Sequence, residues 1–112
     1  MTYLANAFSL NMLSDVKEAK ILVKEVETED VRKILLNSGF VSAIGHSSTA
    51  QVLTQILGFE IPVNRIPIKL TDKDVLIVFQ LLSRLEEGKI LTKEELEKLT
   101  YKFYVVYIVD ED

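Results

Sequence analysis

The sequence predicts an α/β fold, in which one compact domain holds a mixed sheet of about five strands covered by helices. Two runs, 75–82 and 103–109, are apolar on both faces, as strands inside a covered sheet must be. Segments with helical spacing of apolar residues alternate with the expected strands along the chain. The chain has 112 residues, of which 48% are hydrophobic, and contains no linker-like run. We therefore expect one domain, residues 1–112, with a single core.

The first third of the chain supplies two expected strands and one helix. Residues 3–6 and 19–26 are enriched in strand formers, and residues 8–13 between them are expected to be a loop with one helical turn. Thr28 is a suitable N-cap for a helix that ends at Gly39.

Six further elements are expected, namely an extended segment at 40–44, a helix from Ser48 to Gly58, an edge strand at 65–70, a central strand at 75–82, a helix from Thr92 to Leu99 and a central strand at 103–109. Ser48 and Thr92 each have a Gln or Glu three residues later, which is the spacing of a capping box. Pro67 places its segment at an edge, because proline has no N–H to donate to a second strand.

Composition argues against several classes of protein. The chain has no cysteine, which excludes a disulfide framework and a thiolate metal site, and its single histidine argues against structural zinc. We therefore expect chemistry without a metal or cofactor. The formal charge of −4 disfavours a protein that coats long DNA or RNA. No apolar run approaches the roughly 20 residues that span a bilayer, and no signal peptide is evident, so a cytoplasmic protein is expected.

The only histidine, His46, lies between an apolar extended segment and an expected helix start. A helix start offers unpaired N–H groups and the positive end of a dipole to an anion, and an imidazole titrates near neutral pH. The structural alternative is a cap, a surface residue or a core histidine with satisfied hydrogen bonds.

Other polar residues interrupt or follow apolar runs, where burial without a partner costs about 1–3 kcal/mol. They are Asn6, Ser9, Asn11, Gln80, Arg84 and Glu87. Each has a structural alternative as a turn former, a cap, a buried hydrogen-bonding group or a surface ion pair. A Ser–His hydrolase and a glycine-rich phosphate loop are disfavoured, because no Gly-x-Ser-x-Gly motif occurs and the four glycines are dispersed. Two-carboxylate hydrolysis stays open, although Glu86 and Glu87 are adjacent and would usually point apart. Acid catalysis by one His, assisted by an Arg and a Glu, fits the residues best.

Four segments resemble, in order and spacing, the small viral ring nucleases that act as anti-CRISPR proteins against type III systems. They are Asn6–Leu13, Ala43–Thr49, Asn64–Arg65 and Arg84–Lys89. The resemblance covers almost the entire chain. One departure is Ser47, which stands where the family has Asp after the catalytic His, and we expect this difference to change how the following helix is capped.

The resemblance implies a homodimer that binds cyclic tetra-adenylate across its two-fold axis and cleaves it without a metal, which inhibits type III CRISPR signalling. The ligand's own 2′-hydroxyl would attack, leaving a 2′,3′-cyclic phosphate. His46 would protonate the departing 5′-oxygen, Arg84 would stabilise charge on the scissile phosphate, and Glu87 would orient the ribose or Arg84. The expected ring-binding residues are Asn6, Ser9, Asn11, Ser47, Ser48, Arg65 and Gln80.

Two other functions stay open at this point. The first is a sponge that binds the cyclic oligoadenylate without cleaving it. The second is a nucleic-acid-binding viral regulator, which the net charge of −4 makes the least favoured. If a virus encodes the protein, it is expected to act in the cytoplasm of the host cell.

Overall fold

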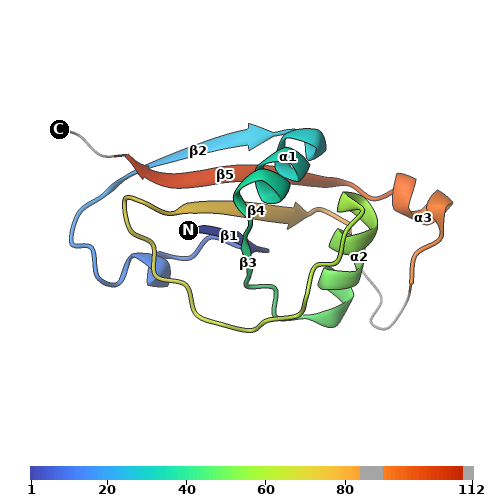
Figure 1. Cartoon of the computed structure of the whole chain (residues 1–112), viewed down its shortest axis with the longest axis horizontal. Coiled ribbons are helices and arrows are strands. Elements are labelled where there is room, and N and C mark those ends of the chain that lie inside the picture. The colour runs from blue at the N-terminus through green and yellow to red at the C-terminus, as the bar shows by residue number, and fades with distance from the viewer. Residues whose placement is uncertain (84–89, 110–112) are drawn as a thin grey trace.

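Five strands form one mixed sheet in the computed structural model, which describes residues 1–83 and 90–109 (Figure 1). The strands are β1 (Thr2–Ala5), β2 (Lys20–Val26), β3 (Val41–Ser42), β4 (Val75–Leu81) and β5 (Tyr101–Val109). Their order across the sheet is β2-β5-β4-β1-β3. β1 runs parallel to β3 and β4, whereas β5 runs antiparallel to β2 and β4. The predicted α/β class with a mixed five-stranded sheet is confirmed.

Helices connect these strands, and the first two α-helices end where the sequence predicts, whereas the third ends at Glu97 rather than at the expected Leu99. They are the 3-10 turn η1 (Leu10–Leu13) and the α-helices α1 (Thr28–Ser38), α2 (Ser47–Leu57) and α3 (Lys93–Glu97). Gly39 and Gly58 follow α1 and α2 with φ of 68° and 84°, a conformation that glycine adopts without the cost that a Cβ brings. Among the described residues, no helix has both the length and the apolarity to cross a bilayer.

The starts of two helices differ from expectation. The N-cap of α1 is Glu27, one residue before the expected Thr28, and its N–H donates to Asp30 Oδ2 at 3.1 Å. α2 begins directly after His46 rather than at Ser48, and its first backbone bond joins Ala50 N–H to His46 O at 3.1 Å. The capping-box spacing of Ser48 and Gln51 marks only one possible start, and the bond from Ala50 N–H to His46 O closes a helical turn before it. At α3 the predicted capping box of Thr92 and Glu95 forms with two bonds of 3.2 Å.

The expected edge strand at 65–70 is wrong. This segment has no strand pairing and instead packs Ile68 and Leu70 against the sheet, with 6% and 3% of their surfaces exposed. The N–H of Leu70 donates to Met12 O at 2.8 Å, which joins the segment to η1. The alternating apolar side chains of this segment therefore pack onto the sheet and do not mark a paired strand. Pro67 contributes to this, because it has no N–H to donate to a neighbouring strand.

Two separate layers cover the two faces of the sheet. α1 and α2 bury one face, where Phe79 and Phe103 lie in the larger cluster of buried apolar residues. The η1 segment and residues 65–70 cover part of the opposite face, where Leu76, Val78 and Val106 are buried. We call these the helix face and the loop face. The loop face is only partly covered, because Val23 on β2 stays 57% exposed.

Candidate functional site

The parallel strands end at one edge of the sheet and bring three predicted site segments to it. β1 lies between β3 and β4, and Ala5 at its end is opposite Val78. Asn6 therefore leaves the sheet beside the last residues of β4, where Gln80 lies. Residues 43–46 continue β3 beyond the same edge. Ligands of open α/β sheets bind outside the carboxyl ends of strands, so this edge is the expected place for a site.

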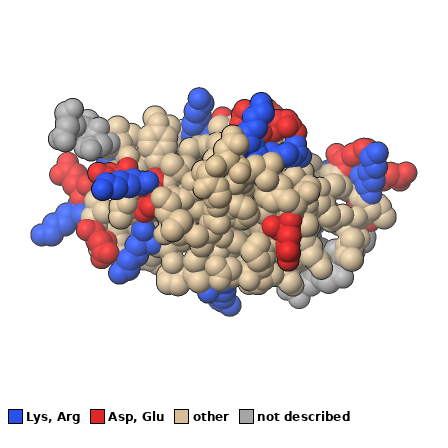
Figure 2. Space-filling model, viewed as in Figure 1, with Lys and Arg blue, Asp and Glu red and all other residues tan. Residues whose placement is uncertain are grey.

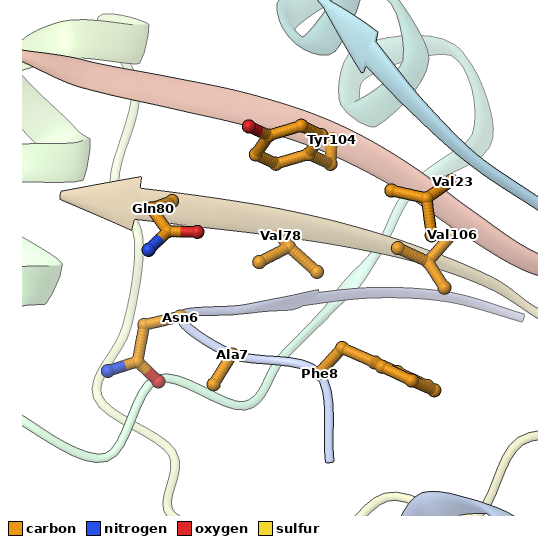
Figure 3. Close-up of a pocket in the computed structure, with 8 residues that line it drawn as sticks. All are labelled: Asn6, Ala7, Phe8, Val23, Val78, Gln80, Tyr104 and Val106. Atoms are coloured by element: carbon orange, nitrogen blue, oxygen red, sulfur yellow. The ribbon is translucent and has the colours of Figure 1, made fainter. Parts of the chain in front are cut away.

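Asn6 and Gln80 line one open groove on the loop face, with a volume of about 430 Å³ (Figure 3). The other lining residues are Ala7, Phe8, Val23, Val78, Tyr104 and Val106. Gln80 had a structural alternative as a buried hydrogen-bonding group, and that alternative is wrong, because its side chain is exposed. It follows four consecutive buried residues of β4, Leu76 to Phe79. A primary amide in a largely apolar groove suits the hydrogen-bonding edge of a nucleobase.

A second groove, of about 320 Å³, begins at the same Asn6 and also holds Ser9 and Asn11. Ser9 has the structural role that was weighed for it, since it is the N-cap of η1 and its Oγ accepts from Asn11 N–H at 3.2 Å. Ala43 and Ile66 line the opposite side. Residues 5–12, at and after the end of β1, and residues 66–69 thus form two walls of this second groove.

His46 is the N-cap of α2, with extended φ and ψ of −127° and 132°. Its imidazole is exposed and makes no capping hydrogen bond to the helix. His46 is therefore a helix cap, as the structural alternative has it, but only its backbone takes part in the capping and its imidazole ring does not. Ser47, exposed, and Ser48, half-buried, are the first helical residues. Because the first N–H groups of a helix have no acceptor within it, an anion beside His46 would meet both the dipole and these donors.

Arg65 comes from a distant segment and lies against the backbone that precedes His46. A Cβ built on Gly45 would be 3.2 Å from Arg65 Cγ and 3.5 Å from its Cδ. Gly45 does not have a positive φ, so glycine is needed here for space rather than for conformation. The aliphatic stem of Arg65 thus lies beside Gly45, two residues before α2 begins, and a guanidinium group on such a stem can bind phosphates bidentately.

Arg84 and Glu87 lie outside the described residues, and the roles expected for them stay predictions. Within residues 1–83 and 90–109, no three His, Asp or Glu side chains converge as a metal site would require. The expectation of metal-independent chemistry is likewise still a prediction.

Sequence reasoning missed several residues that line the grooves. Tyr104 and Val23 come from β5 and β2, and Ile66 and Lys69 come from the covering loop. Tyr104 had no distinguishing signal, because two further tyrosines in the same strand have the same polar-tipped aromatic side chain. Val23 had none, since an exposed valine in an edge strand looks like any other strand residue.

Comparison with known proteins agrees with this architecture. The family model described as STIV B116-like matches residues 2–103. The chain belongs to the STIV B116-like family. Protein 26 of Sulfolobus islandicus filamentous virus is 44% identical over 110 residues, covering 97% of this chain and 92% of the relative. Protein ORF117 of Acidianus two-tailed virus is 40% identical over 93 residues, 80% of each chain.

The solved structure of B116 of Sulfolobus turreted icosahedral virus superposes on this chain with a TM-score of 0.81. The two sequences are 31% identical, and the match covers 95% of this chain and 97% of B116. The chain thus belongs to a family with members in archaeal viruses, and it shares the fold of B116 over 95% of its length.

Proposed function

We propose that the protein is a metal-independent ring nuclease that cleaves cyclic tetra-adenylate and thereby inhibits type III CRISPR signalling. The observation that carries the proposal is the convergence at one sheet edge of an exposed imidazole, a helix start and an arginine. Amide-lined grooves adjoin this edge at Asn6. These groups suit a phosphodiester with nucleobases attached, and membership in a family of archaeal viruses suits an inhibitor of host defence.

The reaction needs no nucleophile from the protein. The ribose 2′-oxygen forms a bond to phosphorus while the bond from phosphorus to the 5′-oxygen breaks, which leaves a 2′,3′-cyclic phosphate and a 5′-hydroxyl. His46 in its protonated form donates the proton to the departing 5′-oxygen, a role that contributes typically 10²–10⁴-fold. Arg84 stabilises charge on the scissile phosphate and Glu87 is the candidate acceptor of the 2′-proton. Holding the 2′-hydroxyl in line with the leaving oxygen contributes further through orientation.

The helix start and Arg65 bind the ring phosphates in this proposal. N–H groups at the beginning of α2 supply fixed donors, and Arg65 supplies charge without a metal. Asn6, Ser9, Asn11 and Gln80 hold the bases and riboses in the adjoining grooves. A compact pocket of this kind is compatible with a net charge of −4, because only a few cations are needed.

Two copies of the chain act together, since a ring of four identical nucleotides fits a site with two-fold symmetry. Each copy then supplies one His46 and one Arg65. Sedimentation equilibrium with and without the ring should give the mass of a dimer, and a monomer at micromolar concentration in both samples would contradict this part of the proposal. The dimer is expected to act in the cytoplasm of the infected cell.

The activity test uses radiolabelled cyclic tetra-adenylate with the protein in excess and EDTA present. We expect linear products that end in a 2′,3′-cyclic phosphate. His46→Ala should slow cleavage by about 10²–10⁴-fold while still binding the ring, because only the acid is removed. Lys98→Ala, at an exposed position at the end of α3, is the matched control and should cleave at the wild-type rate.

The same assay separates the alternatives. Tight binding of a ring that stays intact through long incubation would replace the nuclease with a sponge. Tight, steeply salt-dependent binding to duplex DNA would instead indicate a nucleic-acid-binding regulator. The surface disfavours that last outcome, because acidic and basic side chains are interspersed on the face in Figure 2 and form no continuous basic area there.

A further inference from the structure

A group of hydrogen bonds joins the segment before His46 to the segment before Arg65. Asn64 donates twice, from Nδ2 to Ser42 O at 2.7 Å and from its backbone N–H to Ile44 O at 2.8 Å. Ser42 Oγ donates to Pro62 O at 2.6 Å and accepts from Ile44 N–H at 3.3 Å. We call these four bonds the 42–64 clamp.

The 42–64 clamp is fixed by burial. Ser42 is only 3% exposed, and it is one of the few polar residues among the buried residues of the described chain. Its hydroxyl and carbonyl would lose water without gaining a partner if Asn64 or Pro62 moved away. Ala43 N–H also donates to Leu4 O at 2.8 Å, which ties the clamped segment to β1, an inner strand of the sheet. The clamp is therefore a rigid base on which the neighbouring residues sit.

The clamp ends immediately before His46, the proposed acid, and Arg65, which in the proposal binds a ring phosphate and so holds it against that acid. His46 follows Ile44 after Gly45, and Arg65 follows Asn64 directly. Gly45 also lies against the Arg65 stem, since a Cβ built on Gly45 would be 3.2 Å from Arg65 Cγ. This contact joins the two segments a second time. Asn64 therefore bonds through its side chain to the strand that leads to His46, and in the sequence it directly precedes Arg65.

We infer that Asn64 is a positioning residue that sets where Arg65 lies relative to His46. It does so through the carbonyl of Ser42 and touches no reacting atom. The inference rests on the proposed function for its consequence on rate, although the geometry it describes does not. Because a displacement of about 1 Å can cost on the order of 10²-fold in rate, loss of the clamp should slow cleavage more than it weakens binding.

The test removes the amide donor with Asn64→Ala, and Asn37→Ala at an exposed position of α1 is the matched control. We expect Asn64→Ala to lower the single-turnover rate constant by about 10- to 100-fold and the affinity for cyclic tetra-adenylate by much less. Asn37→Ala should change neither. In an Arg65→Ala background, Asn64→Ala should slow cleavage no further, because the residue through which it acts is gone. Additive losses, or a wild-type rate for Asn64→Ala, would overturn the inference.

Two further measurements keep the inference independent of folding and of the proposed activity. His46 is the only histidine, so its ring signal in proton NMR is unambiguous. Asn64→Ala should move this signal and Asn37→Ala should not, even if the wild-type protein cleaves nothing. If Asn64→Ala does not fold, Gly45→Ala offers a second test. Its added Cβ pushes the Arg65 stem from the Gly45 side and leaves the four bonds of the 42–64 clamp in place. It should likewise slow cleavage and move the signal, and a wild-type result in both would contradict the positioning role.

Discussion

The helix face and the loop face of the sheet differ in what they do. On the helix face, α1 and α2 bury Phe79 and Phe103 almost completely, and their ring centroids are 5.3 Å apart. On the loop face, segments without α-helix cover only part of the sheet and leave open grooves beside Asn6 and Gln80. One face of the sheet therefore holds the main packed core, while the other leaves polar side chains exposed beside open grooves.

We expect the largest effect from a comparison of Phe79 and Gln80, two neighbours in β4 whose side chains lie on opposite faces of the sheet. Phe79→Ala should lower the free energy of unfolding by about 3–5 kcal/mol, because it opens a cavity among packed aromatic rings. Gln80→Ala should change it by less than about 0.5 kcal/mol, since the side chain is exposed. Urea unfolding of both variants measures this, and ring binding should show the reverse order. Equal destabilisation by the two substitutions would break the distinction between the faces.

Arg32 links the two helices of the helix face. Its Nε donates to Leu57 O at 2.8 Å and its Nη2 to Ile56 O at 3.0 Å, at the end of α2, while Nη1 pairs with Glu29. Arg32→Ala should destabilise by about 1.5–3 kcal/mol, the usual value for hydrogen bonds to charged groups. Lys33→Ala, exposed on the same helix, is the control. Thermal unfolding should show a loss of stability for Arg32→Ala and none for Lys33→Ala. The rate of ring cleavage by Arg32→Ala, corrected for the folded fraction, should equal that of the wild type.

Asp74 at the start of β4 should make stability depend on pH. Burial raises the pKa of its carboxyl, but hydrogen bonds from Thr71 N–H and Oγ1, at 2.9 and 3.0 Å, and the amino group of Met1 outweigh burial and hold that pKa below its usual value. A lowered pKa stabilises the folded state above the unfolded-state pKa of about 3.9, and this contribution is lost as pH falls through the folded-state pKa.

Asp74→Asn should therefore lower stability by about 1–2 kcal/mol at pH 7 and flatten its pH dependence below about pH 4. Unfolding by urea at several pH values between 7 and 2 would measure both effects. An exposed carboxyl, Asp72, offers the matched control as Asp72→Asn. A pH dependence that is equally steep in wild type and Asp74→Asn would refute this assignment.

The smallest expected effects concern two glycines that are needed for different reasons. Gly58→Ala should cost about 1–2 kcal/mol, because φ is 84° and a Cβ is disfavoured there although space is open. Gly45→Ala has no such backbone cost and presses only on the flexible stem of Arg65. Thermal unfolding should thus separate Gly58→Ala from wild type and leave Gly45→Ala close to it.

Local signals predicted much of the fold correctly. Runs that are apolar on both faces predicted β4 and β5 as inner strands, and Gly39, Gly58 and the Thr92 capping box marked helix ends. The error at residues 65–70 arose because alternation suits a loop packed on a sheet as well as a strand, and only tertiary contacts distinguish the two. The candidate site was partly predictable, since His46 and Gln80 stand out in apolar surroundings. Tyr104 and Val23 joined it only through strand pairing.

The fold class, the ends of most elements and the residue types available for chemistry follow from the sequence alone, because they depend on periodicity, capping and composition. Strand order, the early start of α2 at His46 and the contact between Gly45 and Arg65 were decided only by the tertiary structure. The physical reason is that each of these depends on burial between segments far apart in the chain. Parallel pairing of β1 with β3 and β4 is such a case, and it is what brings Asn6, His46 and Gln80 to one edge.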